Sequence, residues 1–288
     1  MLEKLIVGAL FDYQFLNGFF IEDPELDKRK IRGLMYISMQ DINDKYGLKI
    51  GGIIHLGAHL GEEAKDYSDI GCEKVIWIEG NPSLIQELKS NVSLYDQNLV
   101  FNVLISDIDK SKVIFNITEF SQSSSILDLG ITKEVHDTKI KERREMNARR
   151  IDSFFTENNI DWHPYNFLNI DLQGYELTAL KSMGALLDNI DWIYTEVNSR
   201  SLYKNCTLLD ELDLFLLKKG FKRVELHMTD WYWGDALYRR ESISRMDYIS
   251  GRFKILGWSV KNRIFGPITK KATGFRRYLG KIRRNIFK

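Results

Sequence analysis

Cysteine is scarce in this chain: Cys72 and Cys206 are the only two among 288 residues. They form no metal-type cluster and suggest no disulfide framework, so we expect a reducing, cytoplasmic compartment. A long apolar run is also lacking, because Glu3 and Asp12 interrupt the apolar N-terminal stretch. That stretch has neither a basic start nor a small-residue cleavage site, which predicts neither a signal peptide nor a membrane-spanning helix.

Acidic residues are absent from residues 251–288, which carry twelve Lys or Arg. Subtracting these from the 41 Lys and Arg leaves 29, against 40 Asp and Glu, so the rest of the chain is acidic although the net charge is +1. Apolar residues interleave with the basic ones. We expect this basic tail to meet an anionic membrane surface, making the protein membrane-peripheral, or an anionic polymer. The alternative is an extension packed on the body or on a second copy in a homodimer, and we expect no nucleic-acid partner.

The length and the pattern of apolar residues predict one α/β domain with additions. Short apolar strands are expected at 52–57, 74–79, 99–105, 167–171, 192–197, 222–228 and 235–240. Amphipathic helices are expected near 61–70, 82–93, 175–187 and 207–219. This alternation favours a mostly parallel seven-stranded sheet of Rossmann-like type, with helices on both faces. The short loop 230–234 makes the last two strands antiparallel neighbours and gives one reversed edge strand.

The additions lie at both ends and inside this domain. We predict a helical N-terminal extension over 1–50, in which Gly47 ends a helix, a central domain over 51–245 and a basic C-terminal extension over 246–288. Residues 112–118 form a hairpin-like insertion, followed by a polar loop at 121–125. Residues 130–150 are strongly charged and helix-prone.

The turn after the first strand contains Gly57 and Gly61, and the second strand ends on Glu79. Glycines let backbone approach a ligand, and an acid about 20 residues on accepts hydrogen bonds from ribose hydroxyls. The third glycine of a dinucleotide motif is missing, and Glu62 and Glu63 would repel a pyrophosphate at the helix start. A nucleoside ligand without phosphate, such as S-adenosylmethionine, fits this turn better than a nicotinamide cofactor.

Each expected strand of the first five ends in polar side chains, which an open α/β sheet brings to one edge. The strand ends carry His55, Gly57, Ala58 and His59, then Glu79 and Asn81, Ser106 and Asp107, Asp171, Gln173 and Glu176, and finally Glu196 and Asn198. We therefore expect the active site at this edge.

These residues resemble the FkbM family of S-adenosylmethionine-dependent O-methyltransferases, over about 52–228. The matching elements are 56–61, 79–82, Ser106-Asp107, 123–125, 150–152 and, most closely, 168–176 followed by 180–184. In contrast to the family pattern, His55 stands where Asp is frequent, His59 replaces Asn, Gly80 replaces Pro and Gln173 replaces Glu. The resemblance implies a class I methyltransferase fold, S-adenosyl-L-methionine as cofactor and cofactor contacts by Gly57, Ala58, His59, Gly61, Glu79, Asn81, Ser106, Asp107 and Asp171.

Methyl transfer to a hydroxyl needs a proton acceptor, and Asp171 is our first choice because it ends the fourth strand. His55 and His59 follow, being nearest to neutral titration. Asp171 binding only the cofactor's amino group, and His55 being a buried core histidine, are the structural alternatives. We expect no metal, although Mg²⁺ held by Asp171 with Glu196 or Asn198 is a minority option.

Three consecutive aromatic residues, Trp231, Tyr232 and Trp233, lie in the last turn. With carboxylates nearby they suggest a wall for a sugar ring, or else a hydrophobic lid or dimer contact. The expected acceptor contacts are Gln173, Glu176, Glu196, Asn198, Ser124, Trp231, Tyr232 and Trp233. The sequence thus predicts O-methylation of a sugar or glycan hydroxyl; a non-catalytic binding module of the same fold is the alternative, and a nicotinamide-dependent oxidoreductase is a more distant one.

Overall fold

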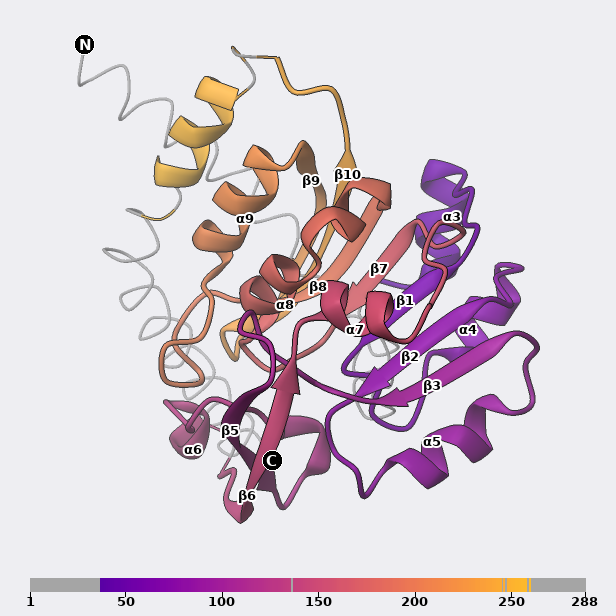
Figure 1. Ribbon diagram of the computed structural model, residues 1–288. Helices are drawn as coiled ribbons and strands as arrows, with labels where there is room; N and C mark the ends of the chain where they lie inside the picture. Colours follow the sequence, from indigo (N-terminus) through magenta and orange to yellow (C-terminus); the bar gives the residue numbers. More distant parts are fainter. Residues whose placement is uncertain (1–36, 136, 245, 247, 258, 260–288) are drawn as a thin grey trace, which may run out of the picture.

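The computed structural model describes residues 37–135, 137–244, 246, 248–257 and 259 (Figure 1). Most of the expected N-terminal extension and of the basic tail lies outside these residues. Helix α3 (Met39–Tyr46) begins after Ser38, whose hydroxyl accepts the N–H of Asp41. It ends at Gly47, which has a φ of 60°, so the predicted helix stop is confirmed.

A seven-stranded sheet forms the centre of the molecule. Its strands are β1 (Ile53–Leu56), β2 (Val75–Glu79), β3 (Asn98–Asn102), β7 (Phe167–Ile170), β8 (Trp192–Asn198), β9 (Phe221–Met228) and β10 (Trp233–Arg240). They lie in the order β3-β2-β1-β7-β8-β10-β9. The chain order reverses between β1 and β7, both of which are parallel to their neighbours there. The carboxyl ends of β1 and β7 therefore flank the place where open α/β sheets bind ligands.

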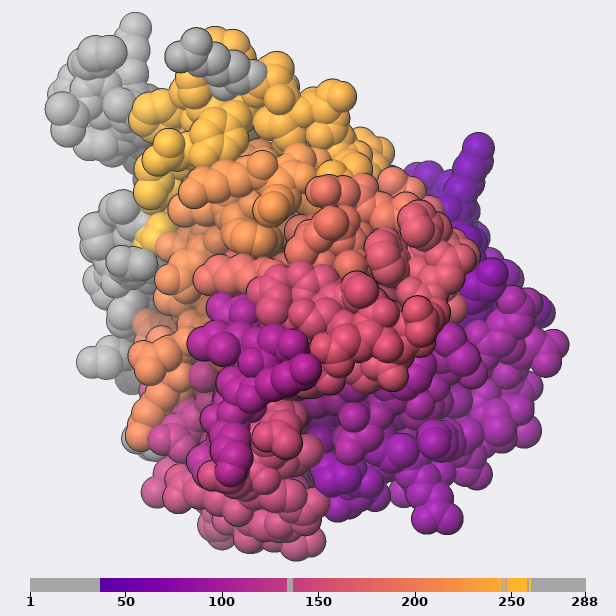
Figure 2. All heavy atoms as spheres, in the orientation of Figure 1, coloured from indigo at the N-terminus to yellow at the C-terminus, as the bar shows by residue number. Residues whose placement is uncertain are grey.

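Helices cover both faces of this sheet, as predicted. One face packs against α7 (Ile151–Glu157), α8 (Glu176–Ser182), the 3-10 helix η2 (Gly184–Asn189) and α9 (Leu209–Lys218). Figure 2 shows the atoms of these elements as a continuous layer over that face. The other face packs against α3, α4 (Ala64–Asp69) and α5 (Ile85–Val92). Alternate residues serve the two layers: Ile54 and Leu56 belong to the first, and Ile53 belongs to the second.

The antiparallel end of the sheet is a hairpin of β9 and β10. Strand β10 is antiparallel to both β8 and β9. The reversed strand is therefore β10, one place in from the edge, and β9 is the edge strand. Among the described residues, no helix has both the length and the apolar character needed to cross a membrane.

A second sheet of three strands, in the order β4-β6-β5, lies in the insertion between β3 and β7. It consists of β4 (Leu104–Ile105), β5 (Ser111–Thr118) and β6 (Ile140–Arg149), with η1 (Ser121–Ser123) and α6 (Thr132–Val135) between β5 and β6. The prediction of helix over 130–150 is wrong for most of its length. Side chains alternate along the second half of β6, with Arg144, Met146 and Ala148 less exposed than their neighbours, because this strand pairs with β5. The expected strand 99–105 is likewise divided, since Leu104 and Ile105 pair with β6.

Candidate active site

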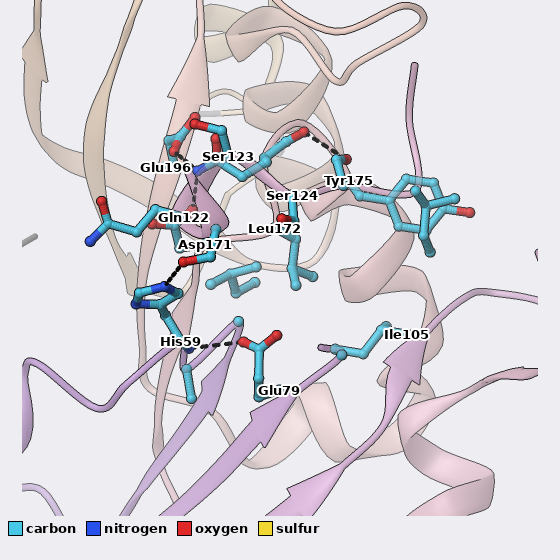
Figure 3. A pocket seen from close by; sticks show the side chains of 18 of the residues that line it. His59, Glu79, Ile105, Gln122, Ser123, Ser124, Asp171, Leu172, Tyr175 and Glu196 are labelled. Atoms are coloured by element: carbon cyan, nitrogen blue, oxygen red, sulfur yellow. Dashed lines mark hydrogen bonds between the residues drawn. The ribbon is translucent and has the colours of Figure 1, made fainter. Parts of the chain in front are cut away.

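A cavity of about 470 Å³ lies at the carboxyl ends of the parallel strands. Residues at the ends of β1, β2, β7 and β8 line one side, and the second sheet with the segment 120–126 lines the other. Figure 3 shows side chains from both sides converging on it. Ten predicted site residues line this cavity: His55, Gly57, Ala58, His59, Glu79, Ser124, Asp171, Gln173, Glu196 and Trp233.

Gly57 allows the ends of β1 and β7 to meet. Its φ is 88°, and a Cβ at this position would lie 1.8 Å from the carbonyl oxygen of Asp171. Only glycine tolerates both the backbone angle and this approach. The turn is completed by the N–H groups of Gly57 and Ala58, which both donate to the carbonyl of Ile78 on β2. Ligand-facing backbone of three strands is thereby brought together.

Glu79 ends β2 with its side chain buried at the cavity (Figure 3). One carboxyl oxygen accepts the N–H of His59 at 2.8 Å and the other accepts the N–H of Asn81 at 2.6 Å. Burial raises the pKa of Glu79, and these two N–H groups work against that rise by favouring the carboxylate. Asn81 itself does not line the cavity; its side-chain oxygen accepts the N–H of Ser83.

His59 is held in the turn with both ring nitrogens engaged. Nδ1 lies 2.6 Å from Glu62 Oε1, and Nε2 lies 2.7 Å from Ser121 Oγ. Burial acts to lower the pKa of His59, but the bond to Glu62 and the nearby carboxylates outweigh it and raise the pKa. His59 therefore joins the β1 turn to η1 through both of its ring nitrogens.

His55 is a buried member of β1. Its Nδ1 lies 3.2 Å from the hydroxyl of Tyr67, and its ring lies 5.2 Å from that of Trp77. Burial lowers the pKa of His55 to about 3, so the ring is neutral at physiological pH. It lines the cavity as a weak base in an aromatic setting.

Asp171, Gln173 and Glu196 form a connected group at the ends of β7 and β8. Gln173 Nε2 lies 2.6 Å from Asp171 Oδ1 and 2.7 Å from Glu196 Oε2. Tyr203 donates its hydroxyl to Gln173 Oε1 at 2.7 Å. Burial raises the pKa of Asp171 and of Glu196. The negative charges of Asp171 and Glu176 raise the pKa of Glu196 in addition.

Other predicted site residues lie outside the cavity lining: Gly61, Asn81, Ser106, Asp107, Glu176, Asn198, Trp231 and Tyr232. Glu176 is buried and accepts the N–H groups of Leu172 and Gly174, so it holds the turn after β7. Ser106 Oγ accepts the N–H of Ile108, and the carbonyl of Asp107 accepts a bond from Arg150. Tyr232 lies under the guanidinium of Arg200. Glu176, Ser106 and Asp107 therefore stabilise the neighbouring loops.

Several lining residues were not predicted. Phe120 lines the cavity with 63% of its surface exposed, and Ser121, Tyr203 and Asp235 line it as well. The cavity is acidic: six carboxyl side chains line it, from Glu62, Glu63, Glu79, Asp171, Glu196 and Asp235, and three of these, Glu79, Asp171 and Glu196, were predicted site residues. Among the lining residues that the structure describes, none is Lys or Arg. Within the described part of the chain no three His, Cys, Asp or Glu side chains are placed to hold a metal ion.

The strand order and the switch point between β1 and β7 define the Rossmann-like fold of class I methyltransferases. More particularly, the chain belongs to the FkbM methyltransferase family, since the model of the methyltransferase FkbM domain matches residues 55–223. No curated protein matches the sequence significantly.

The chain is also similar to solved structures, at low sequence identity. Sp1610 from Streptococcus pneumoniae, in complex with S-adenosyl-L-methionine, is 12% identical with a TM-score of 0.42, over 83% of this chain and 88% of that one. TrmK from M. capricolum, in complex with S-adenosyl-homocysteine, is 11% identical with a TM-score of 0.39, over 82% and 90%. A SAM-dependent methyltransferase from Aquifex aeolicus is 12% identical with a TM-score of 0.40, over 69% and 87%.

Family membership identifies S-adenosylmethionine as the cofactor, and the residues present fit it. Glu79 presents a buried carboxylate for ribose hydroxyls, and Gly57 and Ala58 leave room for a ligand beside the turn. An acidic lining suits a sulfonium cation. The size of the cavity lies within the range of small-molecule sites.

Proposed function

We propose that this protein transfers a methyl group from S-adenosylmethionine to a hydroxyl of a sugar or glycan. One observation carries the proposal: Glu79, at the end of β2, and Asp171, at the end of β7, line the same cavity from the two sides of the Gly57 turn. A ribose-binding acid and a proton acceptor are thus available to one bound pair of donor and acceptor.

In this reaction the acceptor oxygen forms a bond to the methyl carbon while the bond from carbon to sulfur breaks. When bound, S-adenosylmethionine supplies the electrophilic methyl group. Asp171 accepts the hydroxyl proton, and the wall of the cavity aligns the acceptor. Alignment can supply roughly 7–11 kcal/mol, and a positioned base contributes roughly 10²–10⁴-fold. His55 is too weak a base, and both ring nitrogens of His59 are engaged, which leaves Asp171 as the acceptor of the proton.

The lining supports a neutral, hydroxyl-rich acceptor. Ionised carboxyl groups accept hydrogen bonds from sugar hydroxyls, and protonated ones can also donate to them. The aromatic rings of Phe120 and Trp233 lie at the same cavity. The described lining offers no Lys or Arg to pair with a phosphate or carboxylate on the acceptor. A neutral sugar therefore suits the charge of the site better than an acidic one.

Calorimetric titration with S-adenosylhomocysteine tests the cofactor half of the proposal. We expect wild type and Glu145→Ala, a change on the exposed side of β6, to bind alike, and Glu79→Ala to lose binding by at least about tenfold because the ribose contact is removed. Asp171→Asn should lower turnover by about 10²-fold or more while changing affinity little. Failure of wild type to bind, or full binding by Glu79→Ala, would refute the proposal.

A binding module without catalysis is the second candidate, because His59 and Gln173 replace the family's Asn and Glu in the cavity. Single-turnover transfer of a labelled methyl group to a panel of glycans separates the two. If the protein binds the cofactor tightly but labels none of the glycans, the binding module without catalysis is favoured. We further propose a cytoplasmic location, with any membrane contact or homodimer made through the basic tail.

A further inference from the structure

Both donor hydrogens of the Gln173 side chain are engaged. Its amide nitrogen has two hydrogens, and it lies within hydrogen-bond distance of Asp171 and Glu196. Its amide oxygen accepts the hydroxyl of Tyr203. The amide nitrogen faces the carboxyl groups because an amide turned the other way would set oxygen against oxygen. Tyr203, whose hydroxyl also lies 3.2 Å from the Ser123 carbonyl oxygen, lies on the oxygen side of the amide.

The backbone of Gln173 is held as firmly as its side chain. Its φ is 54° and that of Gly174 is 96°, so two consecutive residues occupy the left-handed region. The carbonyl of Gln173 accepts the hydroxyl of Ser125, and Glu176 accepts the N–H of Gly174. A non-glycine residue persists in such a conformation only where its surroundings impose it, and such residues cluster at functional sites.

Asp171 and Glu196 follow neighbouring parallel strands, and both carboxyl groups lie within hydrogen-bond distance of the same nitrogen, Gln173 Nε2, at 2.6 and 2.7 Å. Two carboxyl groups this close in a buried site cannot both be ionised. We propose that Asp171 and Glu196 share one proton, and that Gln173, oriented by Tyr203, is a positioning residue that keeps Asp171 the ionised member of the pair. This inference rests on the proposed function only in assigning the catalytic step to Asp171.

The surroundings decide which member ionises. His59 lies near Asp171, and positive charge on its ring lowers the pKa of Asp171 and so favours the carboxylate. Glu196 instead meets the like charges of Glu176 and Asp235. The other titratable groups that act on the pair are Glu62, Glu63, Glu79 and the Tyr203 phenol. The proton consequently resides on Glu196, and the acceptor hydroxyl would deliver a second proton to Asp171.

The identity of residue 173 sets the charge of the group. Glutamine gives two donors and no charge, whereas Glu, which the FkbM resemblance would place there, adds a third carboxyl group within hydrogen-bond distance of the first two. A third acid raises the affinity of the group for protons. The replacement should therefore move the ionisation of Asp171 to higher pH.

Carbon-13 NMR of Asp and Glu carboxyl groups in the full chain, titrated without substrate, tests the pair directly. For wild type we expect the pair to titrate in two steps separated by about two to three pH units. Gln173→Glu should move the first step up by about one pH unit or more, and Gln173→Met should move it up because both donors are lost. Tyr203→Phe should shift it in the same direction by a smaller amount, because the amide is no longer held.

Tyr238→Phe is the matched control, since Tyr238 is a buried tyrosine that donates to Asp213 away from the cavity. In this variant the Asp171–Glu196 pair should titrate as it does in wild type. If Asp171 and Glu196 titrate independently, or if all three site variants leave the steps unmoved, the inference is overturned even where methyl transfer is observed. If the two steps appear and shift as expected but S-adenosylhomocysteine does not bind, the proposed function fails and the proton-sharing pair stands.

The acid limb of the pH–rate profile gives a second measurement once an acceptor is known. Gln173→Glu should shift that limb to higher pH by the same amount as the first NMR step. KM for the acceptor should change less than kcat, because the amide hydrogens of Gln173 are used by the two carboxyl groups. A change confined to KM would contradict the positioning role and indicate a direct substrate contact.

Discussion

Gly57 occupies a position in the cavity wall that only glycine can fill. A substitution to alanine adds one methyl group, which would meet the Asp171 carbonyl at 1.8 Å in a backbone of φ 88°. We predict that Gly57→Ala lowers the free energy of unfolding by more than about 2 kcal/mol and abolishes binding of S-adenosylhomocysteine.

Gly71 supplies the control for this prediction. It also has a positive φ, 78°, but an added Cβ would meet nothing within 4 Å. Gly71→Ala should therefore cost only the backbone strain of about 1–2 kcal/mol and leave binding intact. Urea unfolding and calorimetry on both variants measure the difference. Equal losses would show that the close approach of β1 to β7 is unimportant.

His55 links acidity to stability. Its pKa is lowered by burial from 6.5 to about 3, so the unfolded chain binds a proton between these values and the folded chain does not. The stability that His55 contributes is complete above pH 6.5 and is lost as the pH falls towards 3. Between pH 6.5 and 4.5 the loss is about 2–3 kcal/mol at most, at about 1.4 kcal/mol for each pH unit.

Urea unfolding at pH 7 and pH 4.5 measures this loss. His55→Gln should make stability less dependent on pH, whereas His163→Gln, an exposed site, should behave as wild type. If His55→Gln loses as much stability between pH 7 and pH 4.5 as wild type does, His55 is not the cause of the loss.

At the scale of elements, the segment joining β5 to η1 forms the rim of the cavity. Phe120 is 63% exposed there, and Ile114 on β5 is 46% exposed but does not line the cavity. We predict that Phe120→Ala changes stability by less than about 0.5 kcal/mol and raises the KM for a sugar acceptor about tenfold, since an aromatic face is lost. Ile114→Ala should leave KM unchanged. An unaltered KM for Phe120→Ala would place the acceptor elsewhere in the cavity.

Complete burial makes some strands easy to predict from the sequence. Strands β1 and β2 are short apolar runs buried along their whole length, so their pattern depends on nothing beyond the strand itself. Strand β6 is different, because its charged residues have no strong strand preference and form a strand through pairing with β5. Helix α7 was also missed; it is short, and Ile151 and Phe155 are the buried residues among its seven.

The site shows the same division. Glu79 and Asp171 follow apolar strands and could be assigned from the sequence, because parallel strands bring their carboxyl ends to one edge. Phe120, Ser121 and Tyr203 reach the cavity from segments whose placement depends on the second sheet and on long-range packing. Glu176 was assigned to the substrate for its place after β7, but its carboxylate is used by backbone N–H groups of the turn before it.

At the scale of the whole molecule, charge is divided between an acidic body and a basic tail. Ten of the twelve Lys and Arg residues of 251–288 lie after residue 260, so a chain ending at residue 260 removes most of the positive charge. It keeps the 248–257 helix and the Ser259 hydroxyl that donates to Asp210.

We predict that the full chain sediments with vesicles rich in anionic lipid and that the shortened chain does not, since each basic residue near such a surface contributes about 1 kcal/mol. Binding should also be lost on neutral vesicles, which carry no attracting charge, and in high salt, which screens the attraction. Both chains should bind S-adenosylhomocysteine equally. Equal sedimentation of the two chains would exclude the tail as the membrane contact, and capture of the full chain by an anionic polymer but not by vesicles would assign the tail to that partner instead.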